Sequence, residues 1–198
     1  MTAVATPVGE ADVRLEVPEG APTALLLLGH GAGGGVDSAD LAEVAAAAVA
    51  AGYAVARVTQ PYRVAGRRSP PRAPVLDEAW LAVAGQVLVD GLPLVVGGRS
   101  SGARVACRTA DQVGAVAVVA LAFPTAPPRT PEKDRLAELA APSVPVLVVQ
   151  GERDPFGIPP EAPGRTVTVL HGATHTIRGP AAHAAGVAVT TWLKAVLA

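Results

Sequence analysis

The sequence predicts a three-layer α/β/α sandwich built around a mostly parallel, doubly wound sheet in a chain of 198 residues. Short apolar runs typical of strands alternate with amphipathic segments typical of helices from residue 24 to the end. Several of the apolar runs are continuous, as expected for strands that helices cover on both faces. We expect one domain over residues 11–198 and a flexible polar tail at residues 1–10.

The predicted strands are short runs rich in valine, leucine and alanine. Residues 13–17 alternate apolar and charged side chains, which indicates a strand with one exposed face. The run at residues 24–28 is continuously apolar, which is typical of a central parallel strand. In chain order we expect strands at residues 13–17, 24–28, 53–58, 92–96, 115–121, 144–149 and 166–170.

Helices are predicted between these strands by apolar side chains at helical spacing and by residues typical of helix ends. Asp37 or Ser38 can cap the first helix, which Gly52 closes. Pro74 leads into a second helix, and Pro180 stands at a favourable first position of the last one. We expect helices at residues 38–52, 74–87, from 103 onward, 133–139 and from 180 onward, and a surface loop rich in proline and arginine at residues 60–73.

The composition restricts the classes of function that the chain could serve. The formal net charge is −1, which gives no support for binding to nucleic acids or membrane surfaces. Cys107 is the only cysteine, so no internal disulfide can form and a reducing compartment is expected. No signal peptide is recognisable, and no apolar run approaches the ~18 residues of a membrane span. We expect a cytoplasmic protein from a bacterial genome rich in G and C.

The most informative motif is G-x-S-x-G at residues 98–102, with Ser100 at its centre. A strand-type run precedes the motif and a helix-type run follows it, which is the setting of a nucleophile elbow. Gly98 and Gly102 are small, as needed where the strand and the helix almost touch. The start of the following helix also offers free N–H groups and the positive end of a dipole to a developing oxyanion.

An acid and a base follow two later strands. Asp154 follows the strand at 144–149, and His175 follows the strand at 166–170. The carboxyl ends of parallel strands meet at one edge of the sheet, so these side chains can reach Ser100. Two alternatives stay open at this point: Glu152 as the acid and His171 as the base.

The glycine-rich loop at residues 29–35 allows two interpretations. It matches G-x-G-x-x-G between a strand and a helix, as in dinucleotide-binding proteins. Such a site needs an acid at the end of the next strand, which instead reads Arg-Val-Thr-Gln at residues 57–60. The favoured interpretation is an oxyanion loop, in which the backbone N–H groups of Ala32 (or Gly33) and Ser101 hold the oxyanion. His30 is then expected to fix the loop.

Together these motifs resemble the α/β-hydrolase superfamily on its dienelactone-hydrolase-like side. The closer resemblance is to small hydrolase-like proteins that include a testis-expressed hydrolase-like protein and the hydrolase-like domain of a nonspecific-lethal histone acetyltransferase complex subunit. It covers residues 24–178 and rests on HGAGGGVDS, RVTQPYRVAGRRSPP, GGRSSGARVA, FPTAPPRTPEKDR and QGERDPFG. The resemblance implies Ser100, Asp154 and His175 as a triad in a compact fold. Arg63 and Ala126 depart from the residues expected at their positions.

The resulting hypothesis is a serine hydrolase that cleaves a small ester or thioester through an acyl-enzyme, without a cofactor or a metal. The connection at residues 123–142 is too short for a large lid. Arg99, Arg63 and Arg67 either attract an anionic substrate or belong to a solvated surface. Two other functions are considered: a non-catalytic interaction module, and an NAD(P)-binding oxidoreductase that rests only on the glycine-rich loop.

Overall fold

The computed structural model describes residues 1–198 and contains one eight-stranded sheet. Its strands are β1 (Thr2–Thr6), β2 (Gly9–Glu16), β3 (Leu25–Gly29), β4 (Ala54–Thr59), β5 (Leu94–Arg99), β6 (Ala117–Leu121), β7 (Val146–Gly151) and β8 (Arg165–Leu170). They lie in the order β1-β2-β4-β3-β5-β6-β7-β8. β2 pairs antiparallel with β1 and with β4, and every other pair is parallel.

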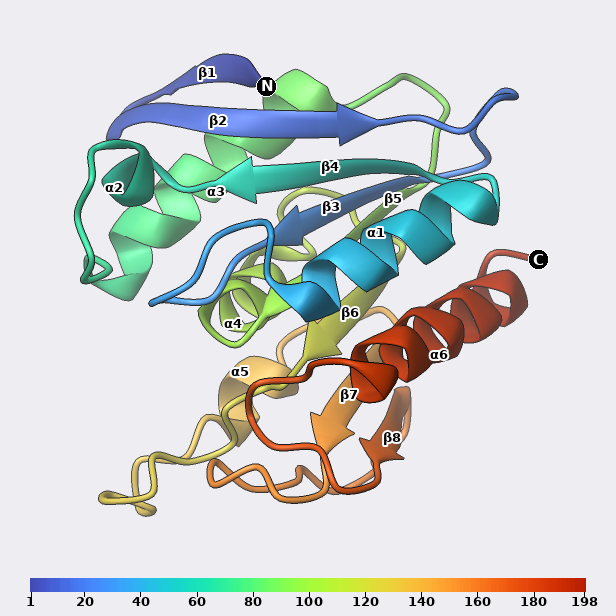
Figure 1. Cartoon of the computed structure of the whole chain (residues 1–198). Helices are drawn as coiled ribbons and strands as arrows, with labels where there is room; N and C mark the ends of the chain where they lie inside the picture. Colours follow the sequence, from blue (N-terminus) through green and yellow to red (C-terminus); the bar gives the residue numbers. More distant parts are fainter.

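Helices cover both faces of the sheet (Figure 1). They are α1 (Ala39–Ala50), α2 (Pro61–Val64), α3 (Ala73–Val87), α4 (Ser101–Thr109), α5 (Leu136–Leu139) and α6 (Pro180–Val196). α1 and α6 pack together on one face, and α3 and α4 lie on the other. No helix combines the length and the apolar character that a membrane crossing requires.

The sheet separates two hydrophobic cores. Leu25 and Leu27 of β3 belong to the core beneath α3 and α4, whereas Leu26 and Leu28 belong to the core beneath α1 and α6. All four leucines are at most 2% exposed. A strand buried on both faces needs apolar side chains at every position, which explains the continuous apolar run. The predicted three-layer architecture is therefore confirmed.

Residues 1–10 differ from the predicted flexible tail. Thr2–Thr6 form β1, an edge strand that pairs with β2 across a turn in which Gly9 has a φ of 123°. Val4 is buried, and the two threonines at the ends of β1 are β-branched. The pairing satisfies backbone groups of β2 that would otherwise be exposed at the sheet edge. The small and polar residues around Val4 gave no strand pattern in the sequence.

The loop predicted at residues 60–73 also contains a short helix, α2. Pro61 occupies its first position, where proline has the φ that a helix needs and where no N–H is required. Tyr62 of the same turn is buried. The helix therefore carries one aromatic side chain from the surface loop toward the sheet.

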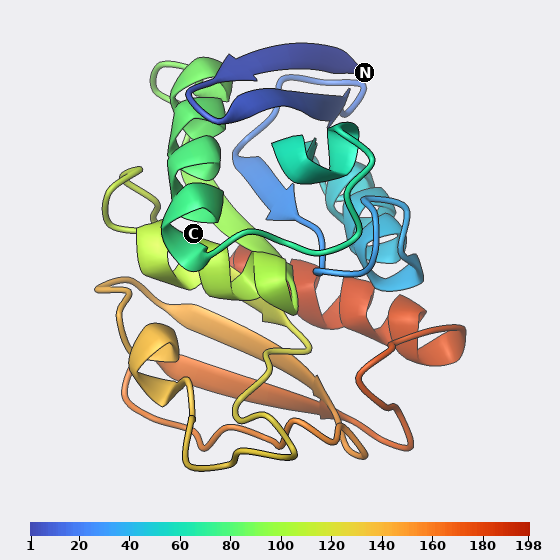
Figure 2. The same cartoon turned by 90° about the vertical axis from the view of Figure 1, so that its left-hand side faces the viewer.

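The loops that follow β3, β4, β6 and β8 gather at the carboxyl ends of the parallel strands, which face the viewer in Figure 2. The connection from β6 to β7 contains only α5, a single turn. Glu138 of α5 holds this connection against α4. It accepts two hydrogen bonds of 2.7 Å from Arg104 and one of 3.1 Å from Arg108.

Glu138→Gln is expected to destabilise the fold by about 1–2 kcal/mol at pH 7, because the partly buried Arg104 loses its charged partner and Arg108 keeps only Asp77. Burial opposes ionisation of Glu138, but the hydrogen bonds and charges of Arg104 and Arg108 lower its pKa below the ordinary 4.5. A lowered folded-state pKa gives stability that is present above the ordinary pKa and disappears as the pH falls below it. Urea unfolding of both proteins at pH 7 and pH 3.5 measures the difference.

Glu132→Gln is the matched control, because Glu132 lies on the same connection, is exposed and makes no ion pair. It should unfold like the wild type at both pH values. A loss of stability in Glu138→Gln that is equal at the two pH values would contradict the role given to the ion pairs.

Candidate active site

The sharp strand-to-helix turn predicted from G-x-S-x-G is present at the end of β5. Ser100 has φ 53° and ψ −108°, and α4 begins at the next residue. A positive φ costs a residue with a side chain on the order of 1–3 kcal/mol, so the surrounding structure must hold it. The Ser100 N–H donates to the carbonyl oxygen of Leu121 at 2.9 Å, which fixes the turn against β6.

The glycines on either side of Ser100 are required by close packing. A Cβ atom on Gly98 would lie 2.5 Å from the carbonyl oxygen of Gly29 in β3. A Cβ atom on Gly102 would collide with the same oxygen even more closely. The strand and the helix thus approach each other as the motif predicts, and α4 starts at the residue after Ser100.

Asp154, His175 and Ser100 form a continuous line of hydrogen bonds. The Nδ1 atom of His175 lies 2.8 Å from Oδ2 of Asp154, and its Nε2 atom lies 3.0 Å from Oγ of Ser100. A carboxylate can only accept, so Nδ1 carries the proton and Nε2 is left to accept from the serine hydroxyl. The side chain of Asp154 is fully buried, and that of His175 is 18% exposed.

Two residues that the sequence analysis did not single out support Asp154 and His175. Nε2 of Gln150, a fully buried side chain in β7, lies 2.8 Å from Oδ2 of Asp154. The same Nε2 lies 3.1 Å from the carbonyl oxygen of Phe123 and 2.8 Å from that of Gly157. All three neighbours are acceptors, so the amide NH₂ group must point toward them. The opposite orientation of the amide would place its oxygen against three other oxygens. The ring of Phe156 lies 4.5 Å from that of His175.

The sequence contains a signal for Gln150, because it is a polar residue inside an otherwise apolar strand. The side-chain amide oxygen of Gln150, Oε1, is buried without a hydrogen-bond partner. Such an atom costs on the order of 1–3 kcal/mol. A core residue retained at this cost fits a role in holding the acid. Asp154 itself also accepts the N–H of Phe156 at 2.9 Å, so it caps its turn as well as facing the histidine.

The alternative acid and base pair with each other instead. Glu152 lies 3.0 Å from Nδ1 of His171 and accepts the N–H of Gly172. That backbone hydrogen bond lowers the pKa of Glu152, with the His171 charge adding to it. The side chain of His171 follows the end of β8 and is 91% exposed. His183 is 75% exposed and lies near Glu43 on α1.

The glycine-rich loop after β3 is anchored by two aromatic side chains. The N–H of Gln60 donates to Nε2 of His30 at 3.1 Å, and Nδ1 of His30 donates to the carbonyl oxygen of Gly31 at 2.8 Å. Burial lowers the pKa of His30, so the ring stays neutral, as this pair of hydrogen bonds requires. The hydroxyl of Tyr62 donates to the carbonyl oxygen of Ala32 at 3.0 Å. His30 therefore fixes the loop, as expected.

The two N–H groups predicted for the oxyanion hole have no acceptor in the chain. The N–H of Ala32 makes no hydrogen bond, and Ser101 is the first residue of α4, where a helix provides no partner. At the end of β4, where a dinucleotide site needs an acid, the side chain of Gln60 is bound to the carbonyl oxygen of Leu76. No group of three or more histidine, cysteine or acidic side chains is arranged to hold a metal ion.

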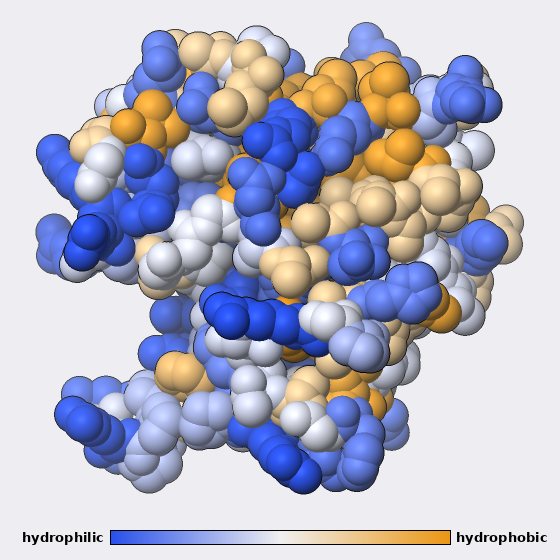
Figure 3. Space-filling view, in the orientation of Figure 1, coloured by the Kyte–Doolittle hydropathy of each residue, from blue (hydrophilic) through white to orange (hydrophobic).

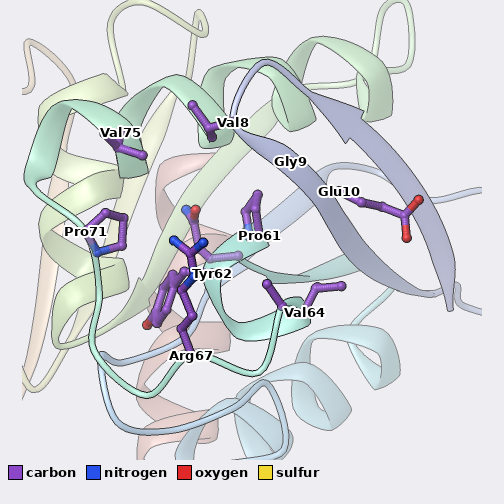
Figure 4. Close-up of a pocket in the computed structure, with 11 residues that line it drawn as sticks. Val8, Gly9, Glu10, Pro61, Tyr62, Val64, Arg67, Pro71 and Val75 are labelled. Atoms are coloured by element: carbon purple, nitrogen blue, oxygen red, sulfur yellow. The ribbon is translucent and has the colours of Figure 1, made fainter.

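The three arginines considered for substrate binding lie in different settings. Arg99 contacts protein partners: its Nε lies 3.3 Å from Oδ2 of Asp40, and its Nη2 donates to the carbonyl oxygen of His175 at 2.8 Å. Arg63 donates to the carbonyl oxygen of Arg67. Arg67 lines a hollow of about 370 Å³ between the β1–β2 turn, α2 and the start of α3 (Figure 4).

The surface is hollowed at the carboxyl ends of the strands, on the left of Figure 3. Hydrophilic side chains flank this notch above and below, at the loop after α2 and at the connection after β6. Ser100 lies at the end of β5, which ends at this edge of the sheet. No large cap covers the edge, since the connection after β6 contains only α5.

Comparisons with known proteins agree with this architecture. A family model described as an alpha/beta hydrolase domain matches residues 22–179. A comparison with curated proteins finds no match. One similar solved structure is an α/β serine hydrolase homologue from Coxiella burnetii, with 18% identity and a TM-score of 0.75 over 100% of this chain and 96% of that chain. Another is an α/β serine hydrolase without lid from Xanthomonas campestris, with 19% identity and a TM-score of 0.76 over 99% of this chain and 92% of that chain. A third is a dienelactone hydrolase from Anabaena variabilis, with 18% identity and a TM-score of 0.75 over 98% of this chain and 95% of that chain.

At these identities the solved structures establish the fold, which is the predicted compact α/β-hydrolase fold without a large cap. The family model covers most of the chain, including the strands and loops that carry Ser100, Asp154 and His175. The chain therefore belongs to the α/β-hydrolase family.

Proposed function

We propose that this protein is a serine hydrolase that cleaves a carboxylic ester or thioester through an acyl-enzyme. The observation that carries the proposal is the line of hydrogen bonds from Asp154 through His175 to Ser100, on a strained elbow. The roles are those of a catalytic triad: Ser100 as nucleophile, His175 as base and Asp154 as the orienting acid. The fold of serine α/β hydrolases supports a hydrolase activity.

In the acylation step, Oγ of Ser100 attacks the carbonyl carbon of the substrate while Nε2 of His175 takes the hydroxyl proton. The N–H groups of Ala32 and Ser101 stabilise the negative charge on the carbonyl oxygen. The bond from the carbonyl carbon to the leaving oxygen or sulfur then breaks, and His175 returns its proton to that atom. Asp154 stabilises the imidazolium during this exchange and does not itself take the proton.

In the deacylation step, water attacks the carbonyl carbon of the acyl-enzyme. Nε2 of His175 takes a proton from that water, and the same two N–H groups hold the oxyanion again. The bond to Oγ of Ser100 breaks, and His175 returns the proton to Oγ. The acid is released and the free serine hydroxyl is restored, so the cycle needs only water as a second substrate.

The direct test is labelling with a fluorophosphonate, which forms a stable bond only with an activated serine. The expected result is one adduct per chain, located at Ser100 by mass spectrometry of the peptides. A protein that is folded and remains unlabelled would overturn the proposal, and so would an adduct confined to another serine.

The two other functions considered from the sequence give different results in the same experiment. A non-catalytic interaction module would show neither labelling nor ester turnover. An oxidoreductase would quench NAD(P)H fluorescence in a titration, whereas the proposed hydrolase leaves that signal unchanged.

The arginine loop extends the proposal to the charge of the substrate. Arg63, Arg67, Arg68 and Arg72 lie within ten residues of one another, and none makes an ion pair with an acid. Arg67 is exposed, and Figure 4 shows its side chain among the residues of the hollow beside α2. We include Arg63 and Arg67 as groups that attract an ester bearing a carboxylate or phosphate.

Activity on an anionic ester is therefore expected to fall as the salt concentration rises, because exposed charges are screened beyond ~8–10 Å at physiological ionic strength. Activity on a neutral ester of equal length should barely change. The charge-reversal variant Arg67→Glu/Arg68→Glu should raise KM for the anionic ester and leave kcat nearly unchanged, since these groups act on encounter. Equal salt dependence for both esters, measured by steady-state kinetics, would show that the loop is only a solvated surface.

A further inference from the structure

Arg99 is the last residue of β5 and directly precedes Ser100. Its side chain is only 14% exposed, and that of its partner Asp40 is 2% exposed. Oδ2 of Asp40 faces Nε of Arg99, while Oδ1 accepts the N–H of Leu41 in the first turn of α1. A carboxylate buried this deeply needs a cationic partner, and the start of a helix adds a favourable dipole. The Asp40 carboxylate thus holds the guanidinium of Arg99 in one place.

The same guanidinium lies against the glycine-rich loop. A Cβ atom on Gly31 would lie 2.8 Å from Nη1 of Arg99, so a larger residue there would force the arginine side chain to shift. Gly31 directly precedes Ala32, whose N–H faces no acceptor in the chain. The position of Arg99 therefore limits where that N–H can lie relative to Ser100.

Arg99 also holds the segment that carries His175. This segment is irregular between Ala173, whose carbonyl oxygen accepts the N–H of Arg153, and the buried Ile177. The backbone of His175 makes a single hydrogen bond. Its carbonyl oxygen accepts that bond from Nη2 of Arg99 at 2.8 Å. Without that bond, the main chain of His175 itself has no hydrogen bond and is held only through its neighbours, such as Ala173 and Ile177.

We propose that Arg99, held by Asp40, is a positioning residue that fixes the main chain of His175 and the glycine-rich loop relative to Ser100. This inference rests on the proposed function, and it replaces the expectation that Arg99 contacts an anionic substrate. A displacement of about 1 Å between reacting groups can cost on the order of 10²-fold in rate. Loss of Arg99 should therefore lower kcat, and it should do so for neutral and anionic substrates alike.

The test compares Arg99→Ala with Arg104→Ala by steady-state kinetics on 4-nitrophenyl butyrate and on the anionic 4-nitrophenyl hydrogen succinate. We expect Arg99→Ala to lower kcat about 10- to 100-fold for both esters, with KM changed less than about twofold. Arg104 is the matched control, because it is a partly buried arginine whose side chain pairs with Glu138 and makes no hydrogen bond to the triad. Its variant should keep nearly the wild-type kcat.

Chemical rescue separates a positioning role from a general loss of structure. Guanidinium chloride at millimolar, non-denaturing concentrations should restore part of the kcat of Arg99→Ala, because the free cation can bind between Asp40 and His175. Urea at the same concentrations has a similar shape without the charge and should restore nothing. The Arg104→Ala control should respond to neither compound.

Folding is controlled by a second variant, since Arg99→Ala leaves the buried Asp40 carboxylate unpaired. Arg99→Leu/Asp40→Leu removes both charges and should recover the melting temperature while its kcat stays low. Arg99→Lys retains a charge that cannot serve both partners, and it should also lower kcat.

Three results would overturn the inference: a wild-type kcat in the folded double variant, no rescue by guanidinium, or a rise in KM restricted to the anionic ester. The last result would make Arg99 a substrate contact. A wild-type protein that fluorophosphonate does not label would refute the proposed function itself, whereas a labelled wild type with an unaffected Arg99→Ala variant refutes only this inference.

Discussion

Ser100→Ala is expected to lower kcat/KM for an ester by at least ~10³-fold while the protein remains folded. The loss follows because no acyl-enzyme can form without Oγ, and the base His175 then has no hydroxyl to activate. The fold should persist, since the elbow is held by the backbone bond to Leu121 and by the close approach at the two flanking glycines. Steady-state ester hydrolysis and a thermal melt of the same samples test both parts.

Ser101→Ala is the matched control for this prediction. Ser101 is the neighbouring serine, and its backbone N–H, which the mechanism uses, survives the substitution. Its side chain lines a small cavity with Trp80 and Val105 and makes no hydrogen bond to the triad. This variant should retain most of the activity. An inactive Ser101→Ala beside an active Ser100→Ala would show that the nucleophile had been assigned to the wrong serine.

Most of the sheet could be predicted from the sequence because its strands are buried on both faces. All four leucines of β3 lie in one of the two cores, so the strand appears in the sequence as an unbroken apolar run. β1 could not be predicted in this way, because a short edge strand with one buried residue leaves little pattern. Its existence depends on pairing with β2, which is a contact between segments rather than a property of residues 2–6.

In the candidate site, too, the positions of the main residues could be predicted from the sequence, whereas the contacts between segments could not. Ser100, Asp154 and His175 each follow a strand, and parallel strands bring such positions to one edge, so their proximity could be inferred before the structure. The contacts around them could not. No pattern in the sequence marks Asp40, yet it is buried against Arg99. Arg99 looked like a free charge beside the nucleophile, because the sequence does not show which way a side chain at a strand end points.

The choice between the two histidines of the last loop depends on geometry that a substitution can test. His175→Ala is expected to lower kcat/KM as severely as Ser100→Ala, at least ~10³-fold, because the serine loses its base. His171→Ala should retain most of the activity. The ring of His171 is exposed and faces Glu152, so its removal leaves the line from Asp154 to Ser100 untouched. Steady-state hydrolysis of one neutral ester by the two variants measures the contrast.

The double variant Ser100→Ala/His175→Ala distinguishes a shared role from two separate ones. If the two residues act in one proton transfer, removing the second should cost hardly anything more, since the first substitution has already abolished the acyl-enzyme route. Independent contributions would instead multiply, and the double variant would fall far below either single one. A severe loss in His171→Ala with activity retained in His175→Ala would move the base four residues earlier. The Glu152–His171 pair would then have to swing toward Ser100, which the fluorophosphonate labelling rate of each variant would reveal.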